Sequence, residues 1–223
     1  MRMTEVDGPV TGDAGRAAAA GAVLLAGDDL WSDLPPTARA IVVAAIDSFA
    51  DRGFHATTLR HIAAGSGLST AALYVHFRSK DDVLFEVSRR GHARALGLVR
   101  AAAAGEPAGH AFRTLVYAFS RWHAEQRTVA RVVQYEFAAL GPEHREQVTV
   151  LRRATERIVR EVVAEVFGGV DPERPDVRGV ATAVLSLGVD VARWFTPSGP
   201  YTPDGIGRLY CELAERMLVP ARV

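Results

Sequence analysis

Helical periodicity runs through the sequence from Pro35 to its end, and it constrains the fold more than any other feature. Apolar residues recur every three or four positions in successive segments, and Gly and Pro residues separate these segments. In the first segment, Ile41, Ala45 and Phe49 share one side of a helix. No stretch keeps the two-residue alternation of a half-buried strand. The sequence therefore predicts an all-α fold of about nine helices.

Caps and breakers set where these helices are expected to begin and end. Pro35 and Pro36 suit a first helical turn, and Gly53 is expected to end that helix. Thr57 or Thr58, Ser69 and Ser79 are the expected N-caps of three further helices, because a hydroxyl accepts from the free N–H groups of a first turn. The helix after Ser79 is expected to run past Arg100, and the later ones to lie at 108–125, 128–140, 142–167, 176–195 and 203–218.

Composition argues against secreted and membrane proteins. The only cysteine, Cys211, cannot form an intrachain disulfide. The apolar run at 17–26 lacks a positively charged leader, since Arg2 and Arg16 are outnumbered by acidic residues, and no run is long enough to span a bilayer. We therefore expect a cytoplasmic protein that does not enter a membrane, with residues 1–34 forming a flexible or loosely helical tail.

Residues 57–80 carry the most specific signal in the chain. They read TTLRHIAAGSGLSTAALYVHFRSK, two short helical stretches joined by a Gly-containing turn. Ile62, Leu73 and Phe77 can pack together and hold the two helices at a fixed crossing angle, while Gly67 gives the turn a permissive backbone. The second helix then presents a small and mostly neutral face, which suits close approach to the major groove of DNA.

This segment resembles the operator-binding motif of the TetR family. The matching residues, in order, are Thr58, Ile62, Ala63, Gly67, Leu68, Ser69, Leu73, Tyr74, His76, Phe77, Ser79 and Lys80. Two positions depart from the usual pattern, Ser66 where Ala is common and Ala71 where Gly is frequent. Ala71 lies on the face expected to meet the bases, so this departure bears on which operator is bound and not on the fold.

The resemblance implies a division of the chain and a set of DNA-binding residues. It places a three-helix helix-turn-helix DNA-binding domain at 35–80 and a helical ligand-binding and dimerisation domain at 81–223. Phosphate contacts are expected from Thr58, Tyr74, His76 and Lys80. Base contacts are expected from the helix that follows Ser69, which is the third helix of this domain. The full predicted DNA-binding set is Thr58, Ser69, Thr70, Ala71, Ala72, Tyr74, Val75, His76 and Lys80.

The body beyond Lys80 resembles the C-terminal domains of TetR-type repressors of lipid and steroid catabolism. Relatives of that kind often respond to acyl-CoA thioesters, so the resemblance implies a lipid-derived effector. Large apolar side chains with a few polar neighbours are typical of an effector cavity. The predicted ligand-binding residues are Phe119, Trp122, His123, Tyr135, Glu136, Arg193, Trp194 and Phe195. The alternative is that the aromatic residues are ordinary core and the charged ones are solvated.

The last two predicted helices carry apolar stripes wider than one contact face needs. Small residues within the stripes allow a second helix to approach closely. Two such helices meeting their symmetry mates would form the four-helix bundle that the resemblance implies for a homodimer. The predicted interface residues are Val180, Val184, Leu187, Gly188, Val191, Leu209, Leu213 and Met217.

These features predict a transcriptional regulator, a homodimeric repressor that a small-molecule effector releases from a palindromic double-stranded operator. The net charge is zero, and between Pro36 and His92 seven basic residues face five acidic ones, so a helix-turn-helix sensor that has lost DNA binding stays open as an alternative. A small helical enzyme is the other alternative, although the chain has no Gly-x-Ser-x-Gly motif or phosphate-binding Gly loop. No cofactor and no metal ion is expected.

Overall fold

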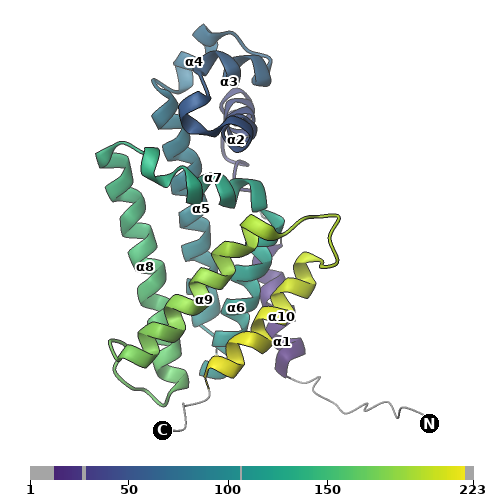
Figure 1. The fold of residues 1–223 in the computed structure, drawn as a ribbon, viewed down its shortest axis with the longest axis vertical. Coiled ribbons are helices and arrows are strands. Elements are labelled where there is room, and N and C mark those ends of the chain that lie inside the picture. The colour runs from purple at the N-terminus through teal and green to yellow at the C-terminus, as the bar shows by residue number, and fades with distance from the viewer. Residues whose placement is uncertain (1–12, 27–28, 106, 219–223) are drawn as a thin grey trace, which may run out of the picture.

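A computed structural model describes residues 13–26, 29–105 and 107–218. These residues form ten α-helices, one short 3₁₀ helix and no strand, which confirms the all-α prediction. In chain order the helices are α1 (Asp13–Leu25), α2 (Pro36–Ala56), α3 (Leu59–Ser66), α4 (Thr70–His76), α5 (Lys80–Ala103), α6 (Ala108–Glu125), α7 (Arg127–Tyr135), the 3₁₀ helix η1 (Phe137–Ala139), α8 (Pro142–Val166), α9 (Pro175–Trp194) and α10 (Pro203–Met217). Figure 1 shows α2, α3 and α4 at one end of an elongated molecule, with α5 running from that end into the body.

Most of the predicted caps and breaks occur where the sequence places them. Thr58, Ser69 and Ser79 are the N-caps of α3, α4 and α5, and each side chain accepts from a backbone N–H of the first turn. Gly53 interrupts α2 with a φ of 76°, after which one more turn reaches Ala56. The predicted helix at 128–140 is the exception, because it ends at Tyr135 and continues as η1.

Two hydrophobic cores follow each other along the long axis. One lies at the end that carries α4 and contains Ile41, Phe49, Ile62 and Leu73. The other fills the body, where α5, α6, α8, α9 and α10 meet. The first core also contains Val129, Val132 and Val133 from α7. This helix therefore belongs in part to the end that carries α2, α3 and α4, which is expected to bind DNA and is called the DNA-binding end below. Within the described ranges, no helix is both long and apolar enough to cross a membrane.

Part of the predicted flexible or loosely helical tail at 1–34 is a helix packed against the body, and for this part the expected looseness is wrong. Residues 13–25 form α1, which packs along α6, and its residues Ala17, Ala18 and Leu25 are buried. Gly21 lies so close to Tyr117 that an added Cβ would come within 2.4 Å of that ring. The Ala-rich composition was interpreted as that of a loosely structured tail, but small side chains also let a helix pack closely against a neighbour. Residues 1–12 of the predicted tail lie outside the described part of the chain.

The segment between α1 and α2 is also held in place. Trp31 is buried in the core of the DNA-binding end. The Arg90 guanidinium on α5 donates to the backbone oxygen of Leu30 at 2.9 Å and forms an ion pair with Asp33. Arg94, one turn further along α5, donates to the backbone oxygen of Leu24 at 2.5 Å. The N-terminal segment therefore contacts the DNA-binding end through Trp31, the middle of α5 through Arg90 and Arg94, and the body through α1.

Candidate functional site

Helix α4 presents the face expected to meet DNA. Leu73 is fully buried beneath it, whereas Tyr74 and Val75 are 54% and 79% exposed. Together these two neighbouring side chains expose apolar surface on α4 that a partner can cover. Of the other predicted residues, Ser69, Ala71 and His76 are exposed, and Thr70 and Ala72 are half-buried. Six side chains of the predicted set thus lie on one short helix, with Ser69 at its cap.

Two local features determine where α3 begins and where it ends. Thr58 and His61 form a reciprocal cap, in which the Thr58 hydroxyl accepts from the His61 backbone and the His61 ring accepts from the Thr58 backbone. Gly67 ends α3 in the left-handed conformation with φ of 70°, which glycine adopts without strain. Thr58 therefore has a structural role in addition to the phosphate contact predicted for it.

The position of Lys80 argues against the direct phosphate contact predicted for it. Its ammonium donates to the backbone oxygens of Phe54 and Thr57 at 2.6 and 2.8 Å, and that of His55 lies 3.4 Å away. It also lies 4.2 Å from the centre of the Phe54 ring. An ammonium group has three protons, and these three carbonyl oxygens account for them. Lys80 therefore joins the start of α5 to the end of α2.

Two arginines that the sequence interpretation did not select are better placed for phosphate. Arg60 on α3 and Arg78 after α4 are exposed, and neither forms an ion pair among the described residues. Free guanidinium groups beside a groove-facing helix are typical phosphate contacts. Helical spacing could have found Arg60, because it points away from the buried face marked by Ile62.

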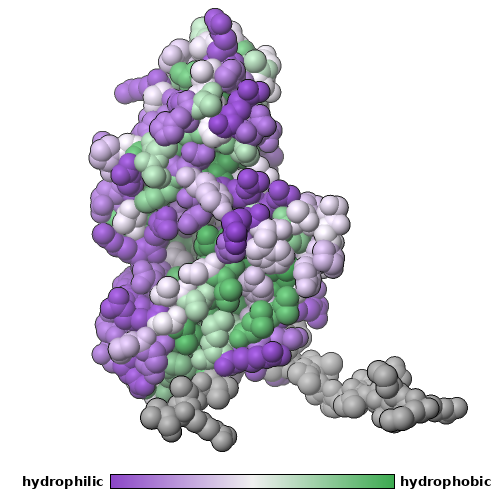
Figure 2. Space-filling model, viewed as in Figure 1, coloured by the Kyte–Doolittle hydropathy of each residue, from purple (hydrophilic) through white to green (hydrophobic). Residues whose placement is uncertain are grey.

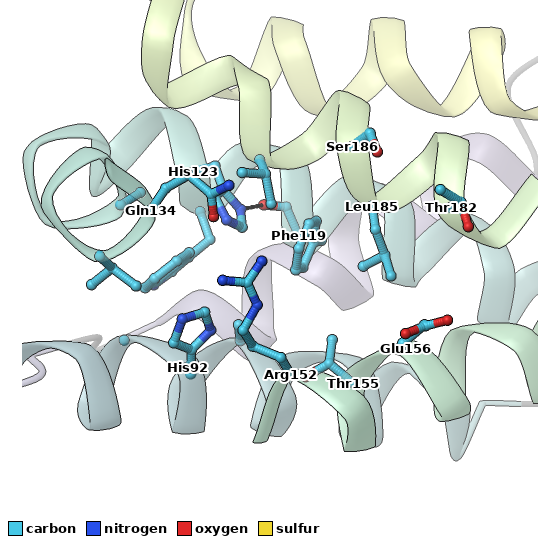
Figure 3. A pocket seen from close by; sticks show the side chains of 16 residues that line it. His92, Phe119, His123, Gln134, Arg152, Thr155, Glu156, Thr182, Leu185 and Ser186 are labelled. Atoms are coloured by element: carbon cyan, nitrogen blue, oxygen red, sulfur yellow. Dashed lines mark hydrogen bonds between the residues drawn. The ribbon is translucent and has the colours of Figure 1, made fainter. Parts of the chain in front are cut away.

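A cavity of about 360 Å³ lies in the body below α7. Helices α5, α6, α7, α8 and α9 all contribute to its wall (Figure 3). Its apolar lining comes from Ala95, Phe119, Trp122, Ala130, Val133, Leu185 and Val189, with Gly91. Its polar lining comes from His92, His123, Gln134, Arg152, Thr155, Glu156, Thr182 and Ser186. The size is at the lower end of the range of roughly 300–1,000 Å³ for small-molecule sites.

Only part of the predicted ligand-binding set lines this cavity. Phe119, Trp122 and His123 do, and Tyr135 and Arg193 line an adjoining groove of about 440 Å³ that shares six residues with the cavity. Tyr135 itself is 56% exposed. The groove also contains Asp190, which forms an ion pair with Arg193 at 2.6 Å.

The other three predicted ligand-binding residues lie elsewhere. Glu136 faces the DNA-binding end and its carboxylate lies beside Gly53. Burial lowers the pKa of Lys80 there, and the negative charge of Glu136 opposes this shift. Phe195 is buried in the body core, and Trp194 packs edge-on against Tyr201. These positions correct the prediction, because neighbours in sequence at the end of a helix point in different directions. Residues from α5 and α8, such as His92 and Arg152, were missed because no local pattern connects them to α6.

Burial controls the ionisation of the polar groups in the cavity. Burial, then the nearby charge of Arg152 and then His123, lowers the pKa of His92 to about 3. Burial lowers the pKa of His123 to about 4, although its hydrogen bond to the Phe119 backbone opposes the shift. Both rings are therefore neutral at pH 7. Burial also lowers the pKa of the Arg152 guanidinium, which still carries its charge because arginine starts from such a high value.

Helix α7 connects the cavity to the DNA-binding end. Ala130, Val133 and Gln134 line the cavity, while Val129 and Val132 pack with the core that supports α4. Helix α5 runs from the DNA-binding end into the body (Figure 1), and α7, which packs against α2, adds a second connection between the cavity and the DNA-binding end.

Family models and known relatives match this arrangement. A model described as "Tetracyclin repressor-like, C-terminal domain" matches residues 105–218, more than half of the chain, and one described as "Bacterial regulatory proteins, tetR family" matches residues 41–87. The chain belongs to the TetR family. It is a helix-turn-helix transcriptional regulator.

Three relatives illustrate the similarity. A solved bacterial regulatory protein of the tetR family from Rhodococcus RHA1 is 37% identical, with a TM-score of 0.75 over 82% of this chain and 97% of that one. The HTH-type transcriptional repressor KstR2 of Mycolicibacterium smegmatis is 29% identical over 73% of this chain and 80% of its own length. The HTH-type transcriptional activator FasR of the same organism is 28% identical over 74% of each chain.

The dimer face predicted for this TetR-family chain divides into two groups in the structure. Val184, Gly188 and Val191 point into the body, where a Cβ on Gly188 would come within 2.5 Å of Phe119. These three are core residues of one subunit, so their assignment to the interface is wrong. The remaining predicted residues, Val180, Leu187, Leu209, Leu213 and Met217, are half-buried. Figure 2 shows apolar residues gathered over α9 and α10.

Proposed function

We propose that this TetR-family regulator is a cytoplasmic homodimeric repressor, which leaves a palindromic operator when a small-molecule effector fills the cavity beneath α7. The single observation that carries this proposal is the double role of α7, with Val133 in the cavity wall and Val132 in the core beneath α4. A ligand that pushes on one side of α7 must move residues that support the DNA-binding surface, because packed cores deform little.

The DNA-binding part of the proposal is supported by the exposed face of α4. Tyr74 and Val75 are large and exposed on α4, while Arg60 on α3 and Arg78, two residues after α4, are exposed and form no ion pair among the described residues. This combination suits base contacts flanked by phosphate contacts. The half-buried stripe on α9 and α10 supports the homodimer. In a two-fold dimer, each subunit would place one α4 in a major groove, and the operator would share the two-fold symmetry.

The effector can act only through a difference in affinity. A ligand that binds both spacings of the two DNA-binding units equally shifts nothing, however tightly it binds. We propose that the filled cavity favours a position of α7 and α5 in which the two α4 helices no longer fit successive grooves. Operator DNA then weakens effector binding by the same factor by which the effector weakens DNA binding.

The class of effector and the sign of regulation belong to the same proposal. The likeness of the body to repressors of lipid and steroid catabolism supports a lipid-derived effector, such as an acyl-CoA thioester or the acid it contains. Repression is supported by the relative named as a repressor, while the relative named as an activator is almost as similar. A reporter gene behind the operator distinguishes the two signs.

An electrophoretic shift assay with DNA from upstream of the chain's own gene tests the function. We expect one dimer to bind per operator, with an affinity that falls steeply as salt rises, because phosphate contacts release counterions. A sensor without DNA binding, or an enzyme, would leave the DNA unshifted at all salt concentrations. Operator affinity that no cavity ligand changes would contradict the release mechanism and leave the DNA-binding assignment in place.

A further inference from the structure

Arg152 is a half-buried cation that forms no ion pair among the described residues. Figure 3 shows its side chain rising from α8 into the cavity, toward the space between His92, His123 and Phe119. No carboxylate in the described part of the chain forms an ion pair with it, although Glu156 lines the same cavity one turn along α8. Its one recorded contact with a ring is with Phe137, 4.6 Å from its guanidinium carbon. A charge that is partly withdrawn from water and has no ion-pair partner is energetically unfavourable, so an anionic ligand beside Arg152 would be stabilised.

The two histidines beside Arg152 do not supply the missing negative charge. His123 holds a proton on Nδ1, which lies 2.7 Å from the backbone oxygen of Phe119, a group that can only accept. His92 has a buried Nε2 atom with no partner among the described residues. A neutral imidazole can donate one hydrogen bond to an anion placed against Arg152. The polar side of the cavity therefore has a cation with no ion-pair partner and a ring nitrogen with no hydrogen-bond partner among the described residues.

The apolar part of the cavity lining includes Phe119, Trp122 and Leu185, together with small residues such as Ala95 and Ala130. A ligand that matches both the polar and the apolar part of the lining has an anionic head and an apolar body. The cavity of about 360 Å³ suits a compact molecule, and a ligand that also carries a nucleotide would have to extend into the adjoining groove of about 440 Å³.

We propose that the cavity selects free organic acids, with the ligand carboxylate paired to Arg152 and hydrogen-bonded by His92, and its apolar part against Phe119 and Trp122. This inference rests on the proposed function, in which the cavity is the effector site, and it narrows the effector to the acid itself. A guanidinium binds a carboxylate through two parallel hydrogen bonds, whereas a neutral amide or thioester in the same place leaves the charge unpaired.

Calorimetric titration of the full-length chain with matched pairs of ligands tests the proposal. The probes are octanoate, 4-phenylbutanoate and cyclohexanecarboxylate, each beside its neutral primary amide, with octanoyl-CoA as a further arm. We expect at least one acid to bind about tenfold or more tightly than its amide and than octanoyl-CoA, because a charge-assisted hydrogen bond is lost with the carboxylate. Equal binding of acids and amides, or preferred binding of octanoyl-CoA, overturns the proposal.

Two arginines on one helix provide a matched pair of variants. Arg152→Met removes the cavity charge, and Arg153→Met removes a charge that is 71% exposed and faces away. We expect Arg152→Met to abolish the preference for acids and Arg153→Met to keep it. The unliganded Arg152→Met protein should melt at the same temperature as the parent or higher, because a half-buried charge without an ion-pair partner is gone. If the Arg152→Met variant does not fold, the Arg152→Gln variant is used in its place.

The outcomes separate this inference from the proposed function. If none of the three acids shows Arg152-dependent binding, the inference is overturned. Acids that bind through Arg152 without releasing operator DNA in the shift assay support the inference and contradict the release mechanism. Release of DNA by a neutral amide or by octanoyl-CoA, with no Arg152-dependent acid binding, supports the proposed function and overturns the inference.

Discussion

The DNA-binding end and the body of this protein differ in how their functional residues are assembled. At the DNA-binding end, almost every candidate residue lies on α4 or within one turn of it, so spacing along one helix determines which side chains share a face. In the body, the cavity wall draws on five successive helices, with lining residues spread from Gly91 to Val189. Function at one end depends on local geometry, and function at the other depends on how distant helices pack.

The two regions also use the same residue type for different purposes. Arg60 and Arg78 are exposed, where a guanidinium attracts the phosphate backbone of DNA and salt screens the attraction. Arg152 is placed in a cavity, where screening is weaker and an unpaired charge discriminates strongly between a carboxylate and its neutral analogue. The exposure of an arginine to solvent, and the groups around it, therefore determine which anion it recognises.

The largest expected effect tests which residues of α9 and α10 belong to the body core. Val184→Glu puts a charge where only 4% of the native side chain is exposed, so we expect it to lower the free energy of unfolding by at least about 3 kcal/mol. Leu213→Glu alters a half-buried position on the apolar face, and we expect a folded monomer. Thermal melts followed by circular dichroism and light scattering measure the two effects. A folded, dimeric Val184→Glu variant would contradict the core assignment.

How much could be predicted from the sequence follows the same division. At the DNA-binding end, the caps at Thr58, Ser69 and Ser79 and the exposure of Tyr74 and Val75 on α4 were predicted correctly, because each depends on residues within a few positions of one another. Lys80 shows the limit even there. Its carbonyl partners lie 23 to 26 residues away in sequence, and helical periodicity contains no information about them.

In the body, periodicity predicted the helices but not the partners of their side chains. Val184 and Leu213 both lie on broad apolar stripes, yet one faces inward and the other lies at the surface. A stripe wider than one contact face serves two contacts, and the sequence does not say which side is which. Arg152 was missed for a related reason, since the periodic charges of α8 make it look like one of many solvated arginines.

Acid pH should affect the body before the DNA-binding end. His92 and His123 have folded-state pKa values of about 3 and 4, below the value of about 6.5 for the unfolded chain. Between these values the unfolded state binds more protons, so stability falls as pH falls from about 6.5 to 4, by up to about 1.4 kcal/mol per pH unit for each ring.

Urea unfolding at a series of pH values measures this slope. His92→Gln should flatten the profile between about pH 6.5 and 4, because one group that takes up a proton on unfolding is removed. His76→Gln, at an exposed position on α4, is the matched control. If the profile of His92→Gln has the same slope as the parent, then His92 is not held neutral by its surroundings and its place in the cavity needs revision.

The smallest expected effects separate a structural cation from a phosphate-binding one at the DNA-binding end. Lys80→Met removes the hydrogen bonds to the Phe54 and Thr57 carbonyls, so it should cost about 1–3 kcal/mol of stability. It should weaken DNA binding without changing the salt dependence, since no phosphate contact is lost. Arg78→Ala should leave stability almost unchanged and reduce the salt slope of each DNA-binding unit by about 0.9. Shift assays at several salt concentrations measure both slopes. If Lys80→Met flattens the slope and Arg78→Ala does not, then Lys80 leaves its carbonyl partners for phosphate in the complex, and the resemblance to the family motif predicted its role better than its contacts in the free protein.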